Sequence, residues 1–253
     1  MDLSKNKIKM VRSLEMKKHR KETGLFVAEG NKLVTDNLSM MKCETLIATP
    51  EWYHSHPQAK APEMIVVNRE EMSKVSFLKT PQEVMGIFRQ PTYVLQPDAL
   101  KDKLSLVLDT VQDPGNLGTI IRLADWFGIE HIICSPETAD CFAPKTVQAT
   151  MGAIARIQVH YTPLIPFLEK MQGTPVYGTF LEGDNLYNEK LTSNGLIVMG
   201  NEGKGISDEL RPFISREVHI PSFPADRETS ESLNVAIATA IICSEFRRNS
   251  THS

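Results

Sequence analysis

The pattern of hydrophobic and polar positions changes rhythm several times over the first 90 residues. Ile8, Val11 and Leu14 recur at the spacing of one helical face, and Gly24 is placed to end that helix. Short apolar runs predict strands at 25–28, 44–48, 64–67 and 84–88, and helical spacing predicts helices at 31–40 and 69–78. Helices and strands mixed over so short a stretch are typical of one α/β unit, so we predict a first domain over residues 1–90.

The stretch that follows has no clear period. Residues 91–103 contain Pro91 and Pro97 and predict a linker. Beyond it, apolar runs predict strands at 104–108, 132–134, 157–159, 176–180, 196–199 and 218–220, and helical spacing predicts helices at 117–127, 145–154, 163–171 and 232–246. Strands that alternate with helices are typical of a parallel sheet covered on both faces, so residues 104–253 are predicted to form a second α/β domain.

Charge is unevenly distributed along the chain. The 253 residues carry a formal net charge of −3 at pH 7, so the surface as a whole is not a polycation. The first 21 residues nevertheless contain, against Asp2 and Glu15, the basic residues Lys5, Lys7, Lys9, Arg12, Lys17, Lys18, Arg20 and Lys21. Such a cluster attracts phosphates, and it is equally typical of a solvated helix face. Charge alone leaves both interpretations open.

Cysteine usage and hydropathy narrow the class of protein. Cys43, Cys134, Cys141 and Cys243 have no CxxC spacing and no histidines clustered near them, so we expect no metal site. Reduced thiols suit a cytosolic protein. The first residues lack the apolar core of a signal peptide, and no apolar run approaches the roughly 20 residues of a membrane span. We therefore expect a cytoplasmic protein without a membrane segment.

Two glycine-rich turns follow predicted strands, and neither matches a known phosphate motif. The stretch VMGNEGKGIS at 198–207 fails the spacing GxxxxGK[ST] of a phosphate loop. The turn GNLG at 115–118 lacks GxGxxG, and the next strand ends in Cys-Ser-Pro rather than in an acid that could bind ribose, which disfavours a nicotinamide enzyme. Ligands of parallel sheets lie beyond the carboxyl ends of strands. Polar or small residues follow three such ends, so a flat adenine held by main-chain groups, in a cofactor without phosphate, fits the pattern.

Three stretches in chain order resemble the motifs of the SPOUT superfamily, specifically the SpoU/TrmH-type RNA 2'-O-ribose methyltransferases. They are LDTVQDPGNLGTIIRLADWFG at 108–128, IVMGNEGKGIS at 197–207 and IPSFPADRETSESLNVAIATAI at 220–241. The middle stretch APKTVQATMGAIARI at 143–157 is also similar to the family. KETGLFVAEGNKLVTDNL at 21–38 resembles its RNA-binding domain of ribosomal-protein L30-like fold. The resemblance covers nearly the whole chain.

The resemblance implies an architecture and a cofactor. Residues 104–253 would form a parallel-sheet α/β domain with a deep trefoil knot, an exception to the rule against threaded chains, and the knot would bind S-adenosylmethionine. By motif position Gly200, Ile220 and Leu233 would contact this cofactor, with Thr179 and Phe180 as further candidates. The family works as a homodimer with the active site near the interface. One departure is the loop at 222–231, which is longer than usual in the family.

The resemblance also implies which residues act on the ribose 2'-OH. Arg122 would stabilise the developing alkoxide or an RNA phosphate, because a guanidinium resists the deprotonation that a base requires. Asn116 opens the same helix and would be a further site residue. Its simpler interpretation is an N-cap, which would fix the loop that presents Arg122. Glu202 would orient Arg122 or hold the motif loop. Ser232 would bind substrate or cap the last helix, and Asn234 would anchor the knot loops.

The choice of RNA and the chemistry remain open at this point. The N-terminal domain is similar to that of the ribosomal-RNA branch, so ribosomal RNA is the expected substrate and transfer RNA the alternative. The competing hypothesis from another class is a non-catalytic RNA-binding protein of the same fold. The presence of Asn116, Arg122, Glu202 and Asn234 argues against that hypothesis, since a site relieved of catalysis need not retain them.

Overall fold

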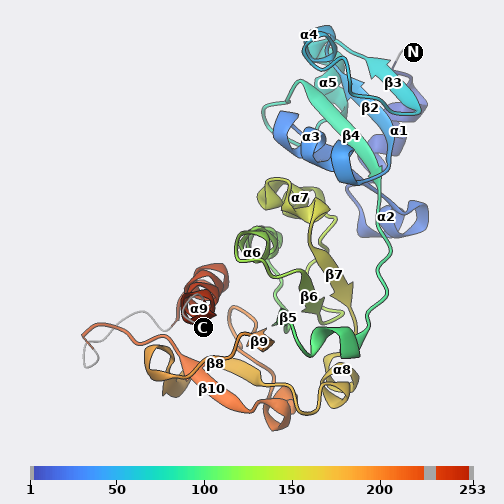
Figure 1. The fold of residues 1–253 in the computed structure, drawn as a ribbon. Helices are drawn as coiled ribbons and strands as arrows, with labels where there is room; N and C mark the ends of the chain where they lie inside the picture. The colour runs from blue at the N-terminus through green and yellow to red at the C-terminus, as the bar shows by residue number, and fades with distance from the viewer. Residues whose placement is uncertain (1–2, 225–231, 251–253) are drawn as a thin grey trace. The chain divides into compact units, whose positions relative to one another are not determined.

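Contacts divide the chain into two units in a computed structural model, which describes residues 3–224 and 232–250. The first unit is Met1–Thr92 with Asp140–Arg156, and the second is Tyr93–Ala139 with Ile157–Ser253 (Figure 1). The sequence predicted an unbroken second domain, whereas the structure places the segment Asp140–Arg156 in the first unit. The reason is apolar packing, because the ring of Phe142 packs against that of Phe26 with centroids 4.9 Å apart, and Val147 joins the same core.

The first unit is built on a four-stranded mixed sheet. Its strand order is β1-β4-β2-β3, in which β4 is antiparallel to both neighbours and β2 and β3 are parallel. The strands are β1 (Leu25–Glu29), β2 (Cys43–Ala48), β3 (Glu63–Val66) and β4 (Val84–Arg89). Successive side chains point to opposite faces, so Phe26 packs in a core with helices α3, α4 and α7, and Val27 packs in a core with α1 and α5. The helices are α1 (Lys5–Ser13), α3 (Asn31–Met40), α4 (Pro50–Ser55), α5 (Arg69–Val75) and α7 (Pro144–Thr150).

The basic N-terminal segment forms two helices rather than the single predicted one. Helix α1 ends at Ser13, and α2 (Lys17–Thr23) ends at Gly24, whose φ of 64° provides the left-handed cap that the sequence predicted. Arg20 is the cause of the break. Its side chain is 3% exposed, donates to the carbonyls of Leu14 and Glu15 at 2.8 and 2.7 Å, and pairs with Asp140 at 2.6 Å. One of the eight basic residues is therefore structural.

The second unit is built on a six-stranded sheet in which every neighbouring pair is parallel. The strand order is β10-β8-β9-β5-β6-β7. The strands are β5 (Leu104–Leu108), β6 (His131–Cys134), β7 (Gln158–Tyr161), β8 (Val176–Asn185), β9 (Gly195–Met199) and β10 (Arg216–His219). This is the parallel, doubly covered sheet that the alternation of strands and helices predicted.

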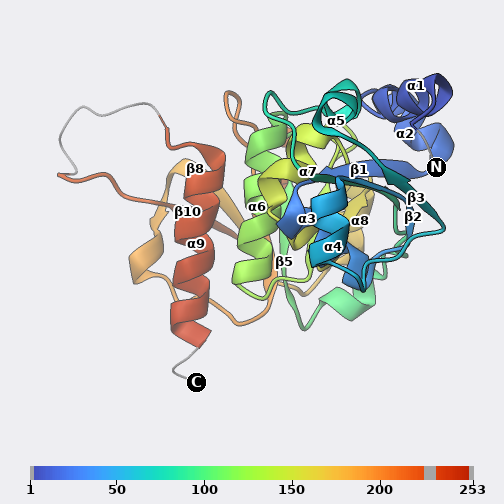
Figure 2. The ribbon, with the colours of Figure 1, turned by 90° about the horizontal axis from the view of Figure 1, so that it is seen from above.

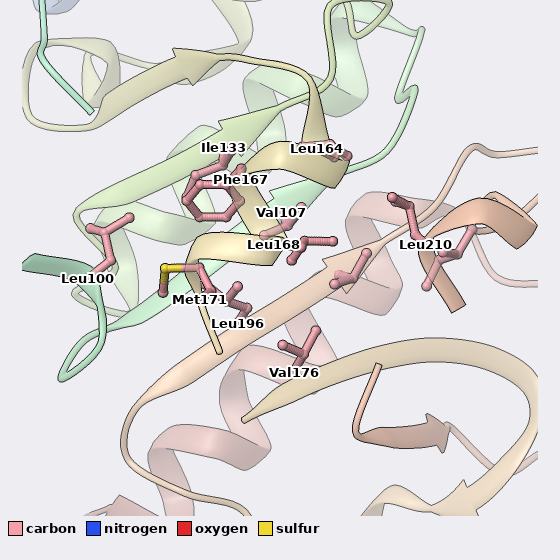
Figure 3. Packing of buried hydrophobic residues seen from close by; sticks show 12 residues of the cluster. Leu100, Val107, Ile133, Leu164, Phe167, Leu168, Met171, Val176, Leu196 and Leu210 are labelled. Atoms are coloured by element: carbon pink, nitrogen blue, oxygen red, sulfur yellow. The ribbon is translucent and has the colours of Figure 1, made fainter. Parts of the chain in front are cut away.

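Each face of this sheet is covered by different helices. On one face Phe167 and Leu168 of α8 (Leu164–Lys170) lie over Val107, Ile133 and Leu196 (Figure 3). On the other face α6 (Pro114–Trp126) and α9 (Val235–Ser250) lie side by side (Figure 2). There the ring of Phe246 meets Tyr177 edge-on at 4.9 Å.

Several short elements differ from the prediction. Helix α4 was not predicted, and the linker contains a short 3-10 turn, η1 (Pro97–Leu100), whose Leu100 is buried. The other 3-10 turns are η2 (Ala153–Ala155), η3 (Leu186–Asn188) and η4 (Asp208–Phe213). Helix α7 ends earlier than predicted, because Met151 takes a left-handed φ of 51°. No helix among the described residues is long and apolar enough to span a bilayer.

Candidate functional site

The predicted cofactor residues lie at one edge of the second sheet. Strands β10, β8 and β9 are parallel neighbours, so their carboxyl ends meet at the same edge. Ile220 directly follows β10, Thr179 and Phe180 lie in β8, and Gly200 directly follows β9. Four residues predicted from separate parts of the sequence are thus brought to one region. Leu233, the fifth, is half exposed just before α9.

The pairing of strand β8 with β10 is interrupted at this edge. Tyr177 and Gly178 pair with the first two residues of β10, and the pairing resumes only at Asp184, so residues 179–183 have no partner on β10. The Thr179 hydroxyl donates to the carbonyl of Val198 at 3.1 Å. The Phe180 ring lies beneath the Arg211 guanidinium at 4.4 Å, a cation–π contact. Residues 179–183 therefore form a stretch of main chain that is not paired with β10.

The glycine loop, residues 200–207, is closed on itself. Asn201 and Gly205 exchange main-chain hydrogen bonds of 2.9 Å, and the Asn201 side chain accepts from the amides of Gly203 and Lys204 at 3.0 and 3.1 Å. A Cβ at Gly200 would overlap the main chain of Gly205 and Ile206, so only glycine fits there. Because the amides of Gly203 and Lys204 are already bonded, they cannot hold a phosphate, in agreement with the sequence argument against a phosphate loop.

Residues from all three motifs form one hydrogen-bonded network. The Glu202 carboxylate accepts from the amides of Gln112 and Asp113 at 3.4 and 3.3 Å and from Asn116 Nδ2 at 3.1 Å. Asn234 Nδ2 donates to Asn116 Oδ1 at 3.0 Å. The network joins the turn before α6 and its first residues to the glycine loop and the residue before α9, which lie 86 and 118 residues after Asn116 in the sequence.

The orientation of both amides in this network is determined by their partners. Asn234 Oδ1 accepts from the amide of Ala236 at 2.9 Å, so its Nδ2 must face Asn116. Asn116 Oδ1 is then the acceptor, and Asn116 Nδ2 faces Glu202, which can only accept while it is ionised. Among residues 3–224 and 232–250, no second hydrogen bond engages the other N–H of Asn116 or the other lone pair of its Oδ1.

The helix caps differ from the simpler interpretations of two residues. The cap of α6 is Asp113, whose Oδ1 accepts from the amide of Asn116 at 2.8 Å, so Asn116 itself is not the cap. Helix α9 begins at Val235 and is capped by Asn234, because Asn234 Oδ1 accepts from the amides of Ala236 and Ile237. The expected cap at Ser232 is therefore wrong, and Ser232 is exposed before the helix.

Arg122 does not join this network. It lies six residues after Asn116 on α6, which turns its side chain by about 240° and moves it by about 9 Å along the axis. Its side chain is exposed. Among the residues that the structure describes, the hydrogen bonds of Glu202 go to Gln112, Asp113 and Asn116. Within one chain Glu202 thus holds the motif turn, and the alternative that it orients Arg122 stays a prediction.

The sequence reasoning did not single out Asn201 and Asp109. Asn201 shapes the glycine loop, and its Nδ2 donates to the carbonyl of Thr110 at 2.7 Å. Asp109 is a buried carboxylate directly after the central strand β5. The signal was present, because an acid that ends a strand of apolar residues must find hydrogen-bond partners. The long loop at 222–231 lies largely outside the described residues, and so do all of its charged residues.

The fold and the candidate site define an α/β protein whose predicted cofactor residues lie at the carboxyl edge of a parallel sheet. The family model described as the SpoU rRNA Methylase family matches residues 103–244, and the model described as an MRM3-like substrate binding domain matches residues 5–86. The chain belongs to the SpoU rRNA methylase family.

Individual relatives and solved structures agree with this assignment. The chain is 32% identical over 252 residues to the 23S rRNA (guanosine(2553)-2'-O)-methyltransferase RlmP of Bacillus subtilis, covering 95% of this chain and 96% of the relative. It is similar, with a TM-score of 0.88 and 40% identity, to a putative RNA methyltransferase of the TrmH family from Porphyromonas gingivalis, covering 98% of this chain and 99% of that one. An AdoMet-bound rRNA methyltransferase from Sinorhizobium meliloti matches with a TM-score of 0.85 and 36% identity, covering 98% and 96% of the two chains.

These comparisons confirm the predicted family and the predicted class of fold. The second unit contains the parallel-sheet α/β fold of the SpoU/TrmH type, and a substrate-binding domain precedes it in the sequence. The trefoil knot and the L30-like fold stay predictions. So do the roles of the individual site residues.

Proposed function

We propose that this protein transfers a methyl group from S-adenosylmethionine to a ribose 2'-OH of RNA, and that the RNA is ribosomal. The observation that carries the proposal is the network of Glu202, Asn116 and Asn234, which gathers the three motifs of a methylase family at one sheet edge. Ribosomal RNA is favoured over transfer RNA, because the full-length relative RlmP is named for 23S rRNA.

The residues at the strand ends fit a nucleoside cofactor without phosphate. The amides of Gly203 and Lys204 are bonded within the loop and do not form a cradle for phosphate, and the absence of a side chain at Gly200 lets the loop fold back on itself. Gly200, Ile220 and Leu233 would hold S-adenosylmethionine, with Thr179 and Phe180 beside them on the stretch of β8 that is not paired with β10. When bound, this cofactor supplies an electrophilic methyl group on a sulfonium.

The residues of this chain would prepare the ribose for attack. A 2'-OH is a poor nucleophile until its proton is polarised, so the site must align the oxygen and stabilise the charge that develops on it. Asn116, fixed by Glu202 and Asn234, would orient the ribose with its second N–H and the second lone pair of its Oδ1, which have no partner within the described part of the chain. Arg122 supplies a permanent positive charge for the alkoxide or an adjacent phosphate. Ser232 is exposed and accessible to the substrate.

RNA would also be bound by the first unit. Lys17, Lys18 and Lys21 are exposed on one side of α2, and the family model over residues 5–86 is that of a substrate-binding domain. A local basic surface supplies salt-dependent affinity without a large net charge.

The protein would function as a cytoplasmic homodimer. Arg122 and Trp126 lie one turn apart on the outer side of α6, where Trp126 is 83% exposed. Ile237 of the neighbouring α9 is 54% exposed. Large apolar side chains on adjacent helices are typical of an interaction surface, and a second copy on this surface would lie next to Arg122. The four described cysteines are free and buried, as in a reducing compartment.

The test is transfer of labelled methyl from S-adenosylmethionine to unmodified ribosomal and transfer RNA, offered separately, with the modified ribose mapped afterwards. The wild-type protein should label one ribose of ribosomal RNA. Arg122→Ala should lower kcat by about 100-fold or more with the fold intact, because a charge at the reacting oxygen is lost. Arg216→Ala, an exposed arginine of the same unit, is the control.

Other outcomes of the same experiment separate the alternatives. Labelling of transfer RNA alone would identify transfer RNA, rather than ribosomal RNA, as the substrate. Full activity of Arg122→Ala would contradict the proposed stabilisation of charge by Arg122. Absence of labelling together with absence of cofactor binding would favour the non-catalytic RNA-binding protein.

A further inference from the structure

A buried carboxylate ties the glycine loop to the central strand of the second unit. Asp109 follows β5 and is 4% exposed. Its Oδ2 accepts from both the amide and the hydroxyl of Ser207, at 2.7 and 2.6 Å. Its Oδ1 accepts from the Thr110 hydroxyl at 3.0 Å. Charge-assisted hydrogen bonds of this length in a buried setting are the strong class.

The next residue is held in a strained conformation by the same contacts. Thr110 has φ of 58°, in the left-handed region that β-branched residues rarely adopt. Its N–H donates to Ser135 Oγ at 3.0 Å, its carbonyl accepts from Asn201 Nδ2 at 2.7 Å, and its hydroxyl donates to Asp109. The strain persists because three separate segments determine this conformation.

The two ends of the glycine loop are therefore fastened to one turn. At the far end Ser207 is held by buried Asp109, and at the near end Glu202 bonds the amides of Gln112 and Asp113. The bonds of Glu202 are exposed and longer, at 3.3 and 3.4 Å, so water competes with them. The hydrogen bonds of Ser207 to Asp109 are the shorter and more buried of the two sets.

We propose that Asp109 is a positioning residue of this site, which holds Ser207 so that Gly200 and Glu202 are in place before a ligand arrives. The inference rests on the proposed methyl transfer, for which Gly200 would hold the cofactor and Glu202 would fix Asn116. A loop that is already ordered does not lose conformational freedom on binding, which is the physical basis of the effect.

The test compares two conservative variants of matched geometry. Asp109→Asn keeps the side-chain size and one acceptor for the Ser207 amide, so the fold should persist. Glu29→Gln is the control, because Glu29 is also buried and also accepts from one hydroxyl and one amide, Ser76 Oγ at 2.6 Å and Phe77 N at 2.7 Å, but in the first unit. Asp109→Asn should raise the Kd for S-adenosylmethionine about tenfold or more and lower kcat, with the KM for RNA unchanged. Glu29→Gln should lower Tm without changing the cofactor Kd.

A double variant isolates the tie itself. If Asp109 acts through Ser207, then Asp109→Asn combined with Ser207→Ala should bind cofactor no more weakly than Asp109→Asn alone. A purely structural role predicts instead that cofactor Kd follows Tm in both variants alike. A cofactor Kd and kcat within twofold of wild type for Asp109→Asn would overturn the proposal.

Hydrogen exchange separates a failure of this inference from a failure of the proposed function. In the protein without cofactor, Asp109→Asn should speed exchange of the amides of Gly205 and Ser207, while Glu29→Gln should not. Unchanged exchange would overturn the positioning role even in an active enzyme. Faster exchange in a protein that neither binds cofactor nor transfers methyl would retain the positioning role and reject the function.

Discussion

Gly200 is the residue at which this site tolerates least change. It follows β9 directly, and its α-carbon lies against the returning main chain of Gly205 and Ile206, without room for a Cβ. Gly203, three residues on in the same loop, is different. A Cβ there would meet only Asn201 Oδ1, at an ordinary 3.7 Å. Of these two glycines in one motif, Gly200 is thus required by the packing of the main chain, whereas Gly203 is not.

This difference gives a prediction at the scale of one residue. Gly200→Ala should open the loop and weaken S-adenosylmethionine binding about tenfold or more, with a loss of stability of about 1–3 kcal/mol from overpacking. Gly203→Ala is the matched control and should bind cofactor like the wild type. Isothermal titration calorimetry and thermal unfolding measure the two effects. Equal cofactor Kd values for both variants would show that the loop at Gly200 does not touch the cofactor.

Helix α2 shows how one short element divides its basic residues between two tasks. Arg20 points inward and links the turn at Leu14 and Glu15 to Asp140. Lys17, Lys18 and Lys21 point outward and are exposed. The buried arginine fixes the helix, and the three lysines form the surface that we propose for RNA.

Replacing the three outward lysines should reduce the salt dependence of RNA binding. Lys17→Gln, Lys18→Gln and Lys21→Gln together should make the slope of log K against log salt shallower by about 2, since each lost phosphate contact removes about 0.7–0.9. Lys79→Gln, Lys170→Gln and Lys190→Gln make the same change in net charge at other exposed positions and should leave the slope near the wild-type value. Filter binding over a range of salt concentrations measures both. An unchanged slope in the α2 variant would remove this helix from the RNA-binding surface.

At the scale of the whole molecule, α6 presents different groups of side chains on different sides. Asn116 in its first turn faces Glu202 and Asn234, and the sides of Leu117 and Ile121 are buried against the sheet. Arg122 and Trp126 face outward beside α9. Within one chain, Arg122 is therefore apart from the network of Glu202, Asn116 and Asn234. In the proposed dimer, Arg122 would lie beside the second copy, which gives the dimer a chemical reason.

The dimer can be tested through its exposed tryptophan. In sedimentation velocity the wild-type protein should behave as a particle of twice the mass of one chain, and Trp126→Glu should shift it to the monomer, because a charge replaces a large apolar side chain at the interface. Val94→Glu, at a side chain that is 77% exposed elsewhere in the second unit, should remain dimeric. A monomeric wild-type protein, or a dimeric Trp126→Glu, would contradict the proposed interface.

Much of the fold could be predicted because the periods of the sequence are local. Strands such as Leu104–Leu108 and helices such as Asn31–Met40 form where the pattern placed them. The single N-terminal helix was predicted incorrectly, since nothing near Arg20 in the sequence indicates that it is buried against a partner 120 residues away. The same reason explains why the sequence could not predict that Asp140–Arg156 packs in the first unit.

The sequence by itself determined the alternation of helices and strands, the glycine that must follow β9, and the three motifs that place the chain in its family. These follow from side-chain periodicity, from the absence of a Cβ and from residue identity, which are all properties of short segments. Only the tertiary structure decided which groups meet. It selected Asn234 rather than Ser232 as the cap of α9, directed Glu202 toward Asn116, and buried Asp109 against Ser207. Hydrogen bonds between distant segments depend on positions of a few ångströms in space, and those positions are set by the packing of the whole sheet.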